Sequence, residues 1–404
     1  MTSPSPSSST SDEAVMIEET NVCGGPSLSL PSETNISSLL LDHGYDVQGW
    51  KRLGLCSDNY LQYIQPVWAS FDAPPYSHHL VIAGFHLFMM LVGCSGNLFV
   101  IVVFIRNRKL RKPSNLLLLN LAISDFVMVL KSFTIIINSV FGGPVLGVIG
   151  CQIYGFSTTV TAVNSIMTLA MIADDRRQMI CNPLDLLHQL TRRQVYYRIL
   201  SLWAYSLVLS ILPLIGISGI RFVPEGFLTS CSFDYMSEDL TNKIFILGFF
   251  AAAWIIPCFR ICSAYYRIVR TVRGTNVEGN LEMTNRGRAG SGNSSGRRRQ
   301  LEMRLAKMVG AVVLLWFVAW TPYAIVTLMG VLGLRSCVFP LLTVIPGVIC
   351  KAAACLNPFI YSISHPHFLN ILKRSWLVRH CACSCLRRPP LTDDLVQAFA
   401  AIHT

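Results

Sequence analysis

Seven long runs of apolar residues constrain the fold of this chain more than any other feature. They cover roughly 80–105, 114–138, 149–173, 198–220, 243–268, 308–332 and 338–363. Each has about the 20 residues that a helix needs to cross a bilayer. Only helices and closed barrels satisfy their backbone groups in hydrocarbon, and barrel strands alternate in polarity whereas these runs do not. The sequence therefore predicts an all-α membrane protein, a bundle of seven transmembrane helices.

Basic residues between the runs predict the orientation of the bundle in the membrane. The first connection holds Arg106, Arg108, Lys109, Arg111 and Lys112, whereas the second, 139–150, holds none. The third and fifth connections are again basic, and the fourth and sixth are poor in Lys and Arg. Because Lys and Arg collect in cytoplasmic loops, we expect an extracellular N-terminus and a cytoplasmic C-terminus. The net charge of +11 reflects this membrane pattern, so no nucleic-acid partner is expected. The expected location is the plasma membrane.

The segments outside the runs are polar and differ in composition. Residues 1–75, rich in Ser, Pro and Thr and without a recognisable signal peptide, read as an extracellular flexible tail. Asn35 begins a glycosylation sequon there, although a single sequon also arises by chance. The seven-helix domain is expected over 76–366, with 273–300, rich in Gly, Asn, Ser and Arg, as a flexible cytoplasmic loop.

The C-terminal region, 367–404, is expected to begin with a short amphipathic helix on the membrane surface. Its apolar positions are Phe368, Leu369, Leu372, Trp376 and Leu377. Cys381, Cys383 and Cys385 follow and are candidate palmitoylation sites, with free thiols or metal ligands as the alternatives. The rest is read as a cytoplasmic tail.

Ionisable residues inside the runs point to function because each is costly in a bilayer. Lys351, in the middle of the seventh run, could be paired with a carboxylate, neutralised by burial, or joined to an aldehyde as a Schiff base. Asp125 could form a buried polar cluster with Asn97 and Asn357, binding water or sodium or serving only structure. Lys131 could reach the outer headgroups, and Arg260 has no partner that the sequence identifies.

A series of motifs gives the chain a specific resemblance. In order these are Gly96-Asn97, Leu119 to Asp125, Cys151, Asp175-Arg176-Arg177, Trp203, Pro257 with Tyr265, Trp320-Thr321-Pro322, and Asn357-Pro358-Phe359-Ile360-Tyr361. Together they resemble the rhodopsin-like G-protein-coupled receptors across about 300 residues. Among these the chain looks like an opsin of the arthropod type, because Lys351 stands six residues before Asn357 and 224–235 is similar to the opsin loop that covers the ligand.

The resemblance to opsins implies a chromophore site. Retinal, as the 11-cis form or a 3-hydroxy derivative, would be bound to Lys351 as a Schiff base. Glu225 would be its counterion, because Tyr154 occupies the helix-three position where vertebrate visual opsins have a glutamate. Trp320 and Tyr323 would pack on the polyene, and Cys151 and Cys231 would form the disulfide over the pocket. The alternative for Glu225 is a solvated loop acid. No metal site is expected.

The position of Lys131 indicates which wavelengths the chromophore would absorb. It stands six residues after Asp125, the spacing of a lysine that marks ultraviolet-sensing insect opsins. A second positive charge near the Schiff base favours its neutral form, which absorbs in the ultraviolet. Ultraviolet or short-wavelength sensitivity is therefore expected, unless Lys131 faces the headgroups.

The same resemblance implies signalling rather than catalysis. Arg176 and Glu302 would form the ion pair that keeps the cytoplasmic cleft closed, and the residues expected to act in coupling or activation with them are Asp175, Tyr265, Asn357, Pro358 and Tyr361. Partners would be a heterotrimeric G protein, expected to be Gq although His365-Pro366-His367 departs from the usual His-Pro-Lys, together with arrestin and a receptor kinase. Asp174-Asp175-Arg176-Arg177 also departs from the family pattern and could re-pair Arg176. The alternatives are an opsin-fold retinal photoisomerase and a receptor for a diffusible amine or lipid. An amine receptor fits poorly, because no acid lies between Cys151 and Asp174.

Overall fold

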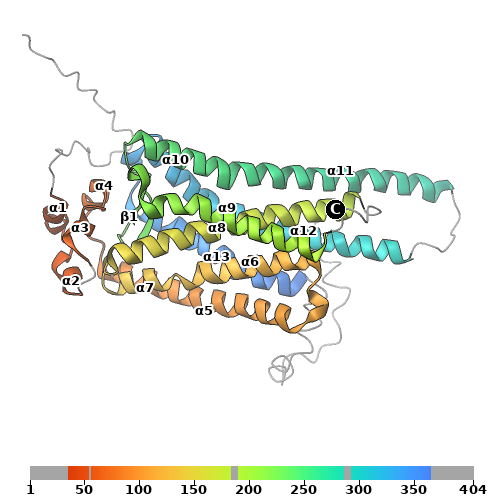
Figure 1. The fold of residues 1–404 in the computed structure, drawn as a ribbon, viewed down its shortest axis with the longest axis horizontal. Helices are drawn as coiled ribbons and strands as arrows, with labels where there is room; N and C mark the ends of the chain where they lie inside the picture. The colour runs from red at the N-terminus through yellow and green to blue at the C-terminus, as the bar shows by residue number, and fades with distance from the viewer. Residues whose placement is uncertain (1–34, 54–55, 183–189, 286–292, 365–404) are drawn as a thin grey trace, which may run out of the picture.

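The structure, a computed structural model, describes residues 35–53, 56–182, 190–285 and 293–364. Seven of its helical segments are long and apolar enough to cross a membrane: Tyr76–Arg106, Pro113–Val140, Gly147–Cys181, Arg192–Ile215, Leu240–Gly274, Gln300–Val331 and Pro340–Ile360. They run along one common axis (Figure 1). The predicted seven-helix bundle is thus confirmed, with the helices beginning and ending several residues from the edges of the apolar runs.

The bounds of the helices differ from those of the spans where one span contains more than one helix or where a helix is longer than its span. The helices are α5 (Tyr76–Arg106), α6 (Pro113–Leu130), α7 (Phe133–Val140), α8 (Gly147–Cys181), α9 (Arg192–Ile215), α10 (Leu240–Phe250), α11 (Ile256–Asn285), α12 (Asn293–Val331) and α13 (Pro340–Ser364). The π turn η3 (Ala251–Ile255) joins α10 to α11, and the short 3₁₀ turns are η1 (Arg108–Leu110), η2 (Ile217–Gly219) and η4 (Arg335–Cys337). The second span bends where α6 ends and α7 begins, with Lys131 and Ser132 at the break.

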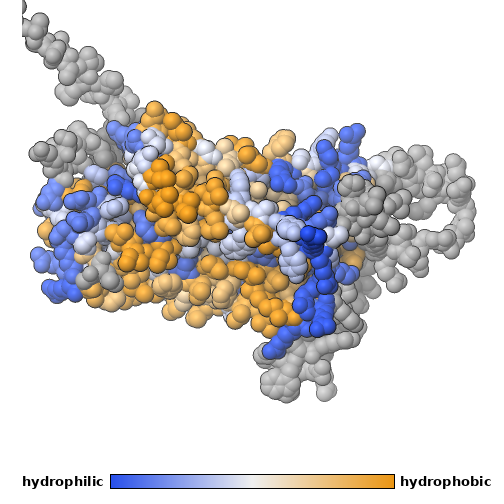
Figure 2. Space-filling model, in the orientation of Figure 1, coloured by the Kyte–Doolittle hydropathy of each residue, from blue (hydrophilic) through white to orange (hydrophobic). Residues whose placement is uncertain are grey.

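The outer surface of the bundle is apolar, as a membrane protein requires. Figure 2 shows an apolar surface around the middle, with hydrophilic residues at one end and in a band near the other. Phe88 is 64% exposed, Leu200 66% and Phe259 75%. Such surface would be unfavourable in water and is stable in hydrocarbon.

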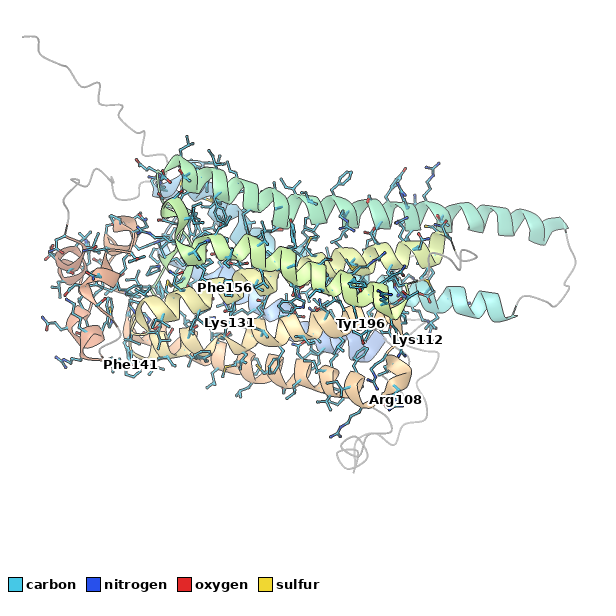
Figure 3. All side chains as sticks on the ribbon, viewed as in Figure 1. Arg108, Lys112, Lys131, Phe141, Phe156 and Tyr196 are labelled. Atoms are coloured by element: carbon cyan, nitrogen blue, oxygen red, sulfur yellow. A yellow bond between two sulfur atoms is a disulfide. The ribbon has the colours of Figure 1, made fainter. Side chains whose placement is uncertain are left out.

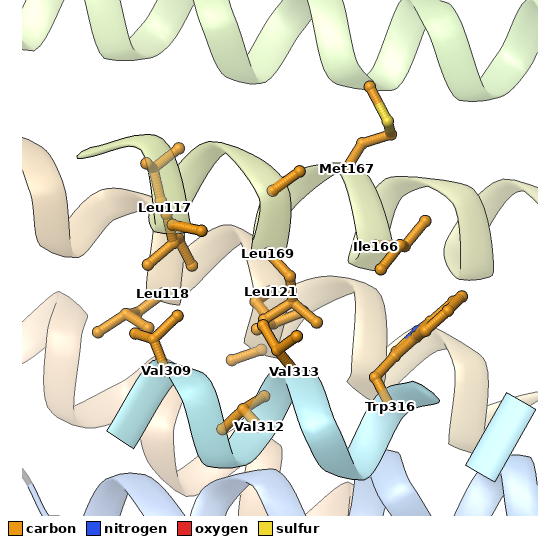
Figure 4. Packing of buried hydrophobic residues seen from close by; sticks show 14 of the residues in the cluster. Leu117, Leu118, Leu121, Ile166, Met167, Leu169, Val309, Val312, Val313 and Trp316 are labelled. Atoms are coloured by element: carbon orange, nitrogen blue, oxygen red, sulfur yellow. The ribbon is translucent and has the colours of Figure 1, made fainter. Parts of the chain in front are cut away.

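Helix α8 lies at the centre and packs against α6, α9, α11 and α12. The core between them is aliphatic. Leu121 of α6, Leu169 of α8 and Val312 of α12 are each almost completely buried, and Trp316 closes this layer (Figure 4). This close packing fixes the positions from which polar side chains enter the bundle.

A small β-hairpin lies across the end of the bundle predicted to be extracellular. Strands β1 (Phe222–Glu225) and β2 (Ser230–Phe233) pair antiparallel, with Phe222 opposite Phe233 and Glu225 opposite Ser230. The turn between them places Gly226 and Leu228 at positive φ. Both strands contact α8, so the hairpin forms one wall of the bundle interior.

The prediction of a flexible tail over 1–75 is wrong for the part that the structure describes. The described residues between 36 and 69 include four short helices, α1 (Ile36–Asp42), α2 (Val47–Arg52), α3 (Asp58–Leu61) and α4 (Pro66–Ala69). Trp50, Tyr60 and Trp68 are each 1% exposed. Burying such aromatic side chains stabilises the segment enough to offset the loss of chain entropy. We call α1–α4 the cap. Asn35, exposed, accepts a hydrogen bond from Ser37 N at the start of α1.

The flexible loop predicted over 273–300 is wrong for most of its length. Helix α11 continues to Asn285 and α12 begins at Asn293, which leaves 286–292 outside the described residues. Good helix formers such as Glu278, Leu281 and Glu282 occur in this stretch and allow the helix to continue. The predicted surface helix and Cys381, Cys383 and Cys385 also lie outside the described residues.

Candidate functional site

The interior of the bundle contains a mostly apolar cavity beneath the hairpin. Its walls come from α5, α6, α7, α8, the hairpin, α10, η3, α12 and α13. Aromatic and aliphatic side chains line most of it, and the ionisable or phenolic residues that also line it are His86, Lys131, Tyr154, Glu225, Tyr323 and Lys351. Six residues predicted for one site, Tyr154, Trp320, Tyr323, Lys131, Glu225 and Lys351, therefore line one cavity.

Lys351 projects into this cavity from the middle of α13. Its side chain is buried, and Nζ donates to the carbonyl of Gly347 at 3.1 Å. Within the described chain it forms no ion pair, so the alternative of a directly paired structural lysine is not what is observed. A desolvated primary amine that lines an apolar cavity is suited to covalent bonding with a carbonyl compound.

Glu225, at the end of β1, is the one acidic residue among the described residues that line the cavity. It is 6% exposed, and it accepts hydrogen bonds from Tyr235 Oη at 2.9 Å and Tyr323 Oη at 3.2 Å. Burial raises the pKa of Glu225 to about 7, while these phenols and the Lys351 ammonium act in the opposite direction. The alternative of a solvated loop acid is therefore wrong.

Lys131 also points into the bundle, at the break between α6 and α7. It is 4% exposed, donates to Thr158 Oγ1, and places Nζ 4.9 Å from the centroid of the Tyr154 ring. Figure 3 places it in the half of the bundle nearer the cap, away from Arg108 and Lys112. The alternative in which Lys131 extends to the headgroups is not observed.

A disulfide holds the hairpin to α8 over the cavity, and tryptophan rings line the cavity. A disulfide joins Cys151, near the start of α8, to Cys231 of β2, with a Cα–Cα distance of 5.3 Å. Below it, Trp320 of α12 stacks on Trp316 with ring centroids 5.5 Å apart. The cavity is thus closed by the hairpin at one end and walled by tryptophan rings deeper in the bundle.

Sequence reasoning missed two residues at this site. His86 of α5 is 2% exposed, lines the cavity, and holds Nδ1 2.9 Å from the carbonyl of Ile82. Tyr235 donates to Glu225 from just beyond β2. An imidazole inside the first apolar run was a usable signal for His86, whereas a tyrosine in a polar loop gave none for Tyr235.

Comparison with known proteins agrees with this geometry. The family described as 7 transmembrane receptor (rhodopsin family) matches residues 96–361. Opsin-2 of Manduca sexta is 37% identical over 80% of this chain and 86% of its own length. The ultraviolet-sensitive opsin of Apis mellifera is 35% identical over 85% of this chain and 91% of its own length. The chain belongs to the opsins, within the rhodopsin family of seven-transmembrane receptors.

The fold of this opsin also matches a solved structure. Squid rhodopsin is 32% identical, with a TM-score of 0.73, covering 79% of this chain and 86% of that chain. The opsin is accordingly a multi-pass membrane receptor of the light-sensing kind.

At the end of the opsin predicted to be cytoplasmic, charged residues cross-link the helices. Arg176 of α8 donates to Glu302 of α12 at 2.6 Å and also pairs with Asp175. Asp174 pairs with Arg260 of α11 at 2.5 Å and lies 3.7 Å from Arg177. Asp174, the acid that departs from the family pattern, thus pairs with other arginines, and Arg176 remains paired with Glu302.

The remaining polar residues connect the helices of the opsin further inside. Asn357 donates to Asp125 at 2.7 Å, and Ser165 donates to the other oxygen of Asp125 at 3.2 Å. Asn97 bonds to the carbonyl of Ala354 at 3.1 Å rather than to Asp125 directly. Tyr265 donates to the carbonyl of Ala306 at 2.9 Å, which joins α11 to α12. Pro358 follows Asn357 in α13, and the side chain of Tyr361 lies outside the described residues.

Proposed function

We propose that this opsin is an ultraviolet- or short-wavelength-sensing receptor that holds retinal as a Schiff base on Lys351 and activates a heterotrimeric G protein of the Gq type. The observation that carries the proposal is the Lys351 amine, buried at a cavity wall without an ion-pair partner in the described chain. Relatives that are opsins support the light-sensing role and a retinal chromophore in general. The choice between the 11-cis form and a 3-hydroxy derivative is part of the proposal.

The residues present fit such a chromophore. The cavity is mainly apolar and lined by several aromatic rings, which suits a polyene, and the Lys351 amine on its wall can bond to an aldehyde. When bound, retinal supplies light absorption and a change of double-bond geometry. Every other task belongs to the chain: Trp320 and Tyr323 supply walls, and the disulfide between Cys151 and Cys231 holds the hairpin over the ligand.

Glu225 would act as the counterion. Tyr154 offers a phenol and a ring face but no negative charge, so a proton at the Lys351 nitrogen depends on Glu225 for compensation. Tyr235 and Tyr323 hold the carboxylate by donating to it. Counterion and amine come from the hairpin and α13, so movement of either element changes their interaction.

Lys131 would set the wavelength. Its ammonium lies on the same Tyr154 ring as that of Lys351, and a second cation in a space of low dielectric favours the neutral form of the Lys351 nitrogen. A relative whose name describes it as ultraviolet-sensitive supports this tuning.

Signalling would follow from opening the end of the bundle that the Arg176–Glu302 pair holds together. Asp175, Tyr265, Asn357, Pro358 and Tyr361 would take part in that change. In the cell we place the N-terminus and cap outside, with the G protein, arrestin and a receptor kinase at the cytoplasmic end, and with Asn35 as a glycosylation site and Cys381, Cys383 and Cys385 as palmitoylation sites. A plasma membrane of photoreceptor type is the proposed location.

The test is light-dependent nucleotide exchange. Full-length protein reconstituted in lipid with 11-cis retinal should stimulate exchange on purified Gq heterotrimers only after illumination. Photoisomerisation without exchange on any heterotrimer would favour the photoisomerase alternative. Exchange on another heterotrimer class alone would retain the receptor and overturn the choice of Gq.

A further inference from the structure

The cap rests directly on the hairpin that carries Glu225. Gln65, just before α4, donates to Asp234 Oδ2 at 2.6 Å. The guanidinium of Arg221 lies 4.7 Å from the ring of Tyr63, and Tyr60 Oη lies 4.0 Å from Cys231 Sγ. These contacts join α3 and the segment between α3 and α4 to both sides of the hairpin.

One series of contacts leads from the cap to the carboxylate. The Trp68 ring meets the Tyr235 ring edge-on, with centroids 6.5 Å apart and an interplanar angle of 76°. Trp68 and Tyr235 are 1% and 2% exposed. Tyr235 then donates to Glu225 at 2.9 Å. A tryptophan of the cap thus contacts the ring of the phenol that binds Glu225.

We propose that the cap is part of the chromophore machinery, with Trp68 acting as a positioning residue that holds Tyr235 on Glu225. The role in light sensing rests on the proposed function, because it concerns the counterion assigned there. The contact by which Trp68 holds Tyr235 on Glu225 does not require bound retinal.

Two physical effects of the cap on Glu225 have opposite signs. As a water shield, the cap would favour the neutral carboxyl, because burial disfavours charge. As a support for Tyr235, it favours the carboxylate, because a donated hydrogen bond stabilises the anion. The groups that face Glu225 are Tyr235, Ser230, Tyr323 of α12 and Lys351 of α13, and the cap contacts only Tyr235 among them in the contacts described above.

The sign of a titration shift therefore distinguishes positioning from shielding. In full-length, retinal-free protein in lipid nanodiscs, the infrared carboxyl band that disappears in Glu225→Gln reports ionisation of Glu225. Tyr235→Phe and Trp68→Ala should each move its midpoint to higher pH, by about one unit, the size expected for one hydrogen bond to a charged group. Trp68→Phe, which keeps an aromatic edge against Tyr235, should restore the wild-type midpoint.

The cap offers a matched control. Trp50 is as deeply buried as Trp68, but it packs beside Gly143 and Tyr45. Trp50→Ala removes the same side chain from the same cap and should leave the Glu225 midpoint unchanged. A lower midpoint in Trp68→Ala, or equal shifts in the two tryptophan variants, would overturn the proposal.

Two further outcomes keep the test decisive. If Trp68→Ala does not fold, Tyr235→Phe, which loses one hydroxyl, and Trp68→Phe carry the test, and a wild-type midpoint in Tyr235→Phe overturns it. If wild-type protein forms no pigment with retinal, the chromophore assignment fails, while the titration, which needs no retinal, still decides whether the cap positions Glu225.

Discussion

The Nζ atoms of Lys131 and Lys351 lie 4.9 Å and 5.5 Å from the centroid of one ring, that of Tyr154. Lys131 lies at the end of α6 and Lys351 in α13, two helices that contact each other, and in the described chain neither amine forms an ion pair. Glu225 is the one acidic residue lining this cavity within the described chain. In a space of low dielectric, one carboxylate can compensate only one positive charge. Protonation of both amines is therefore unfavourable.

Replacing Lys131 tests this arrangement. Lys131→Glu exchanges a like charge for an opposite one, so the protonated, visible-absorbing pigment should gain by roughly tenfold or more over the neutral form. The dark absorption spectrum measures the ratio. Lys131→Gln removes only the positive charge and should give an intermediate shift. Dark spectra identical to wild type in both variants would contradict the assigned tuning role.

The titration of the buried Glu225 carboxyl should make the free energy of unfolding depend on pH. The pKa of Glu225 rises from 4.5 to about 7 on folding. The folded protein therefore holds a proton that the unfolded chain releases, and stability falls as the pH rises through this window, by about 3 kcal/mol. Glu225→Gln should equal wild type in thermal unfolding near pH 4.5 and exceed it above pH 7.

The comparison in that experiment controls for other acids. Burial also raises the pKa of Asp234, to about 6, but Asp234 is present in both proteins and its contribution cancels. An unchanged difference between the two proteins across the pH range would show that Glu225 does not titrate in the folded state.

The two ion pairs at the opposite end should differ in importance. Arg176 and Glu302 are 6% and 14% exposed, whereas Arg260 and Asp174 are 41% and 25% exposed. Glu302→Gln should raise nucleotide exchange in the dark by roughly tenfold to a hundredfold, because a buried charged hydrogen bond is worth roughly 1.5–3 kcal/mol. Asp174→Asn should change it less. Equal dark activities in the two variants would indicate that Asp174 shares the restraint.

The close packing of the hairpin on α8 requires a glycine at position 155. A Cβ added at Gly155 would lie 2.5 Å from the ring of Phe222, which is 1% exposed. Gly155→Ala should therefore displace β1 and destabilise the protein by about 1–3 kcal/mol. Gly84→Ala in α5, where an added Cβ meets nothing within 4 Å, should be neutral or stabilising. Thermal unfolding of the two variants measures the difference.

The bundle and most of the cavity could be predicted from the sequence because both follow from local patterns. Long apolar runs predict spans whatever they pack against. Lys351, Lys131 and Asp125 are conspicuous as charges within such runs. The resemblance to opsins, which rests in part on the spacing of Lys351 from Asn357 and of Lys131 from Asp125, then predicted that the two lysines share one cavity.

The cap could not be predicted in this way, for a physical reason. Its helices are four to seven residues long, too short to show periodicity or to be stable alone. Trp50 and Trp68 are buried by contacts with other segments, and a polar stretch with scattered aromatics gives no sign of those contacts. The ion pair of Arg260 could not be predicted either, because its partner Asp174 is 86 residues away in the sequence.

The site of retinal attachment is the central claim, and the presence of two lysines in one cavity makes it directly testable. Protein incubated with 11-cis retinal, reduced with borohydride and digested should give a single retinyl-modified peptide containing Lys351. Lys351→Ala should form no pigment and give no modified peptide. A retinyl group on Lys131, or a pigment that survives Lys351→Ala, would contradict the account.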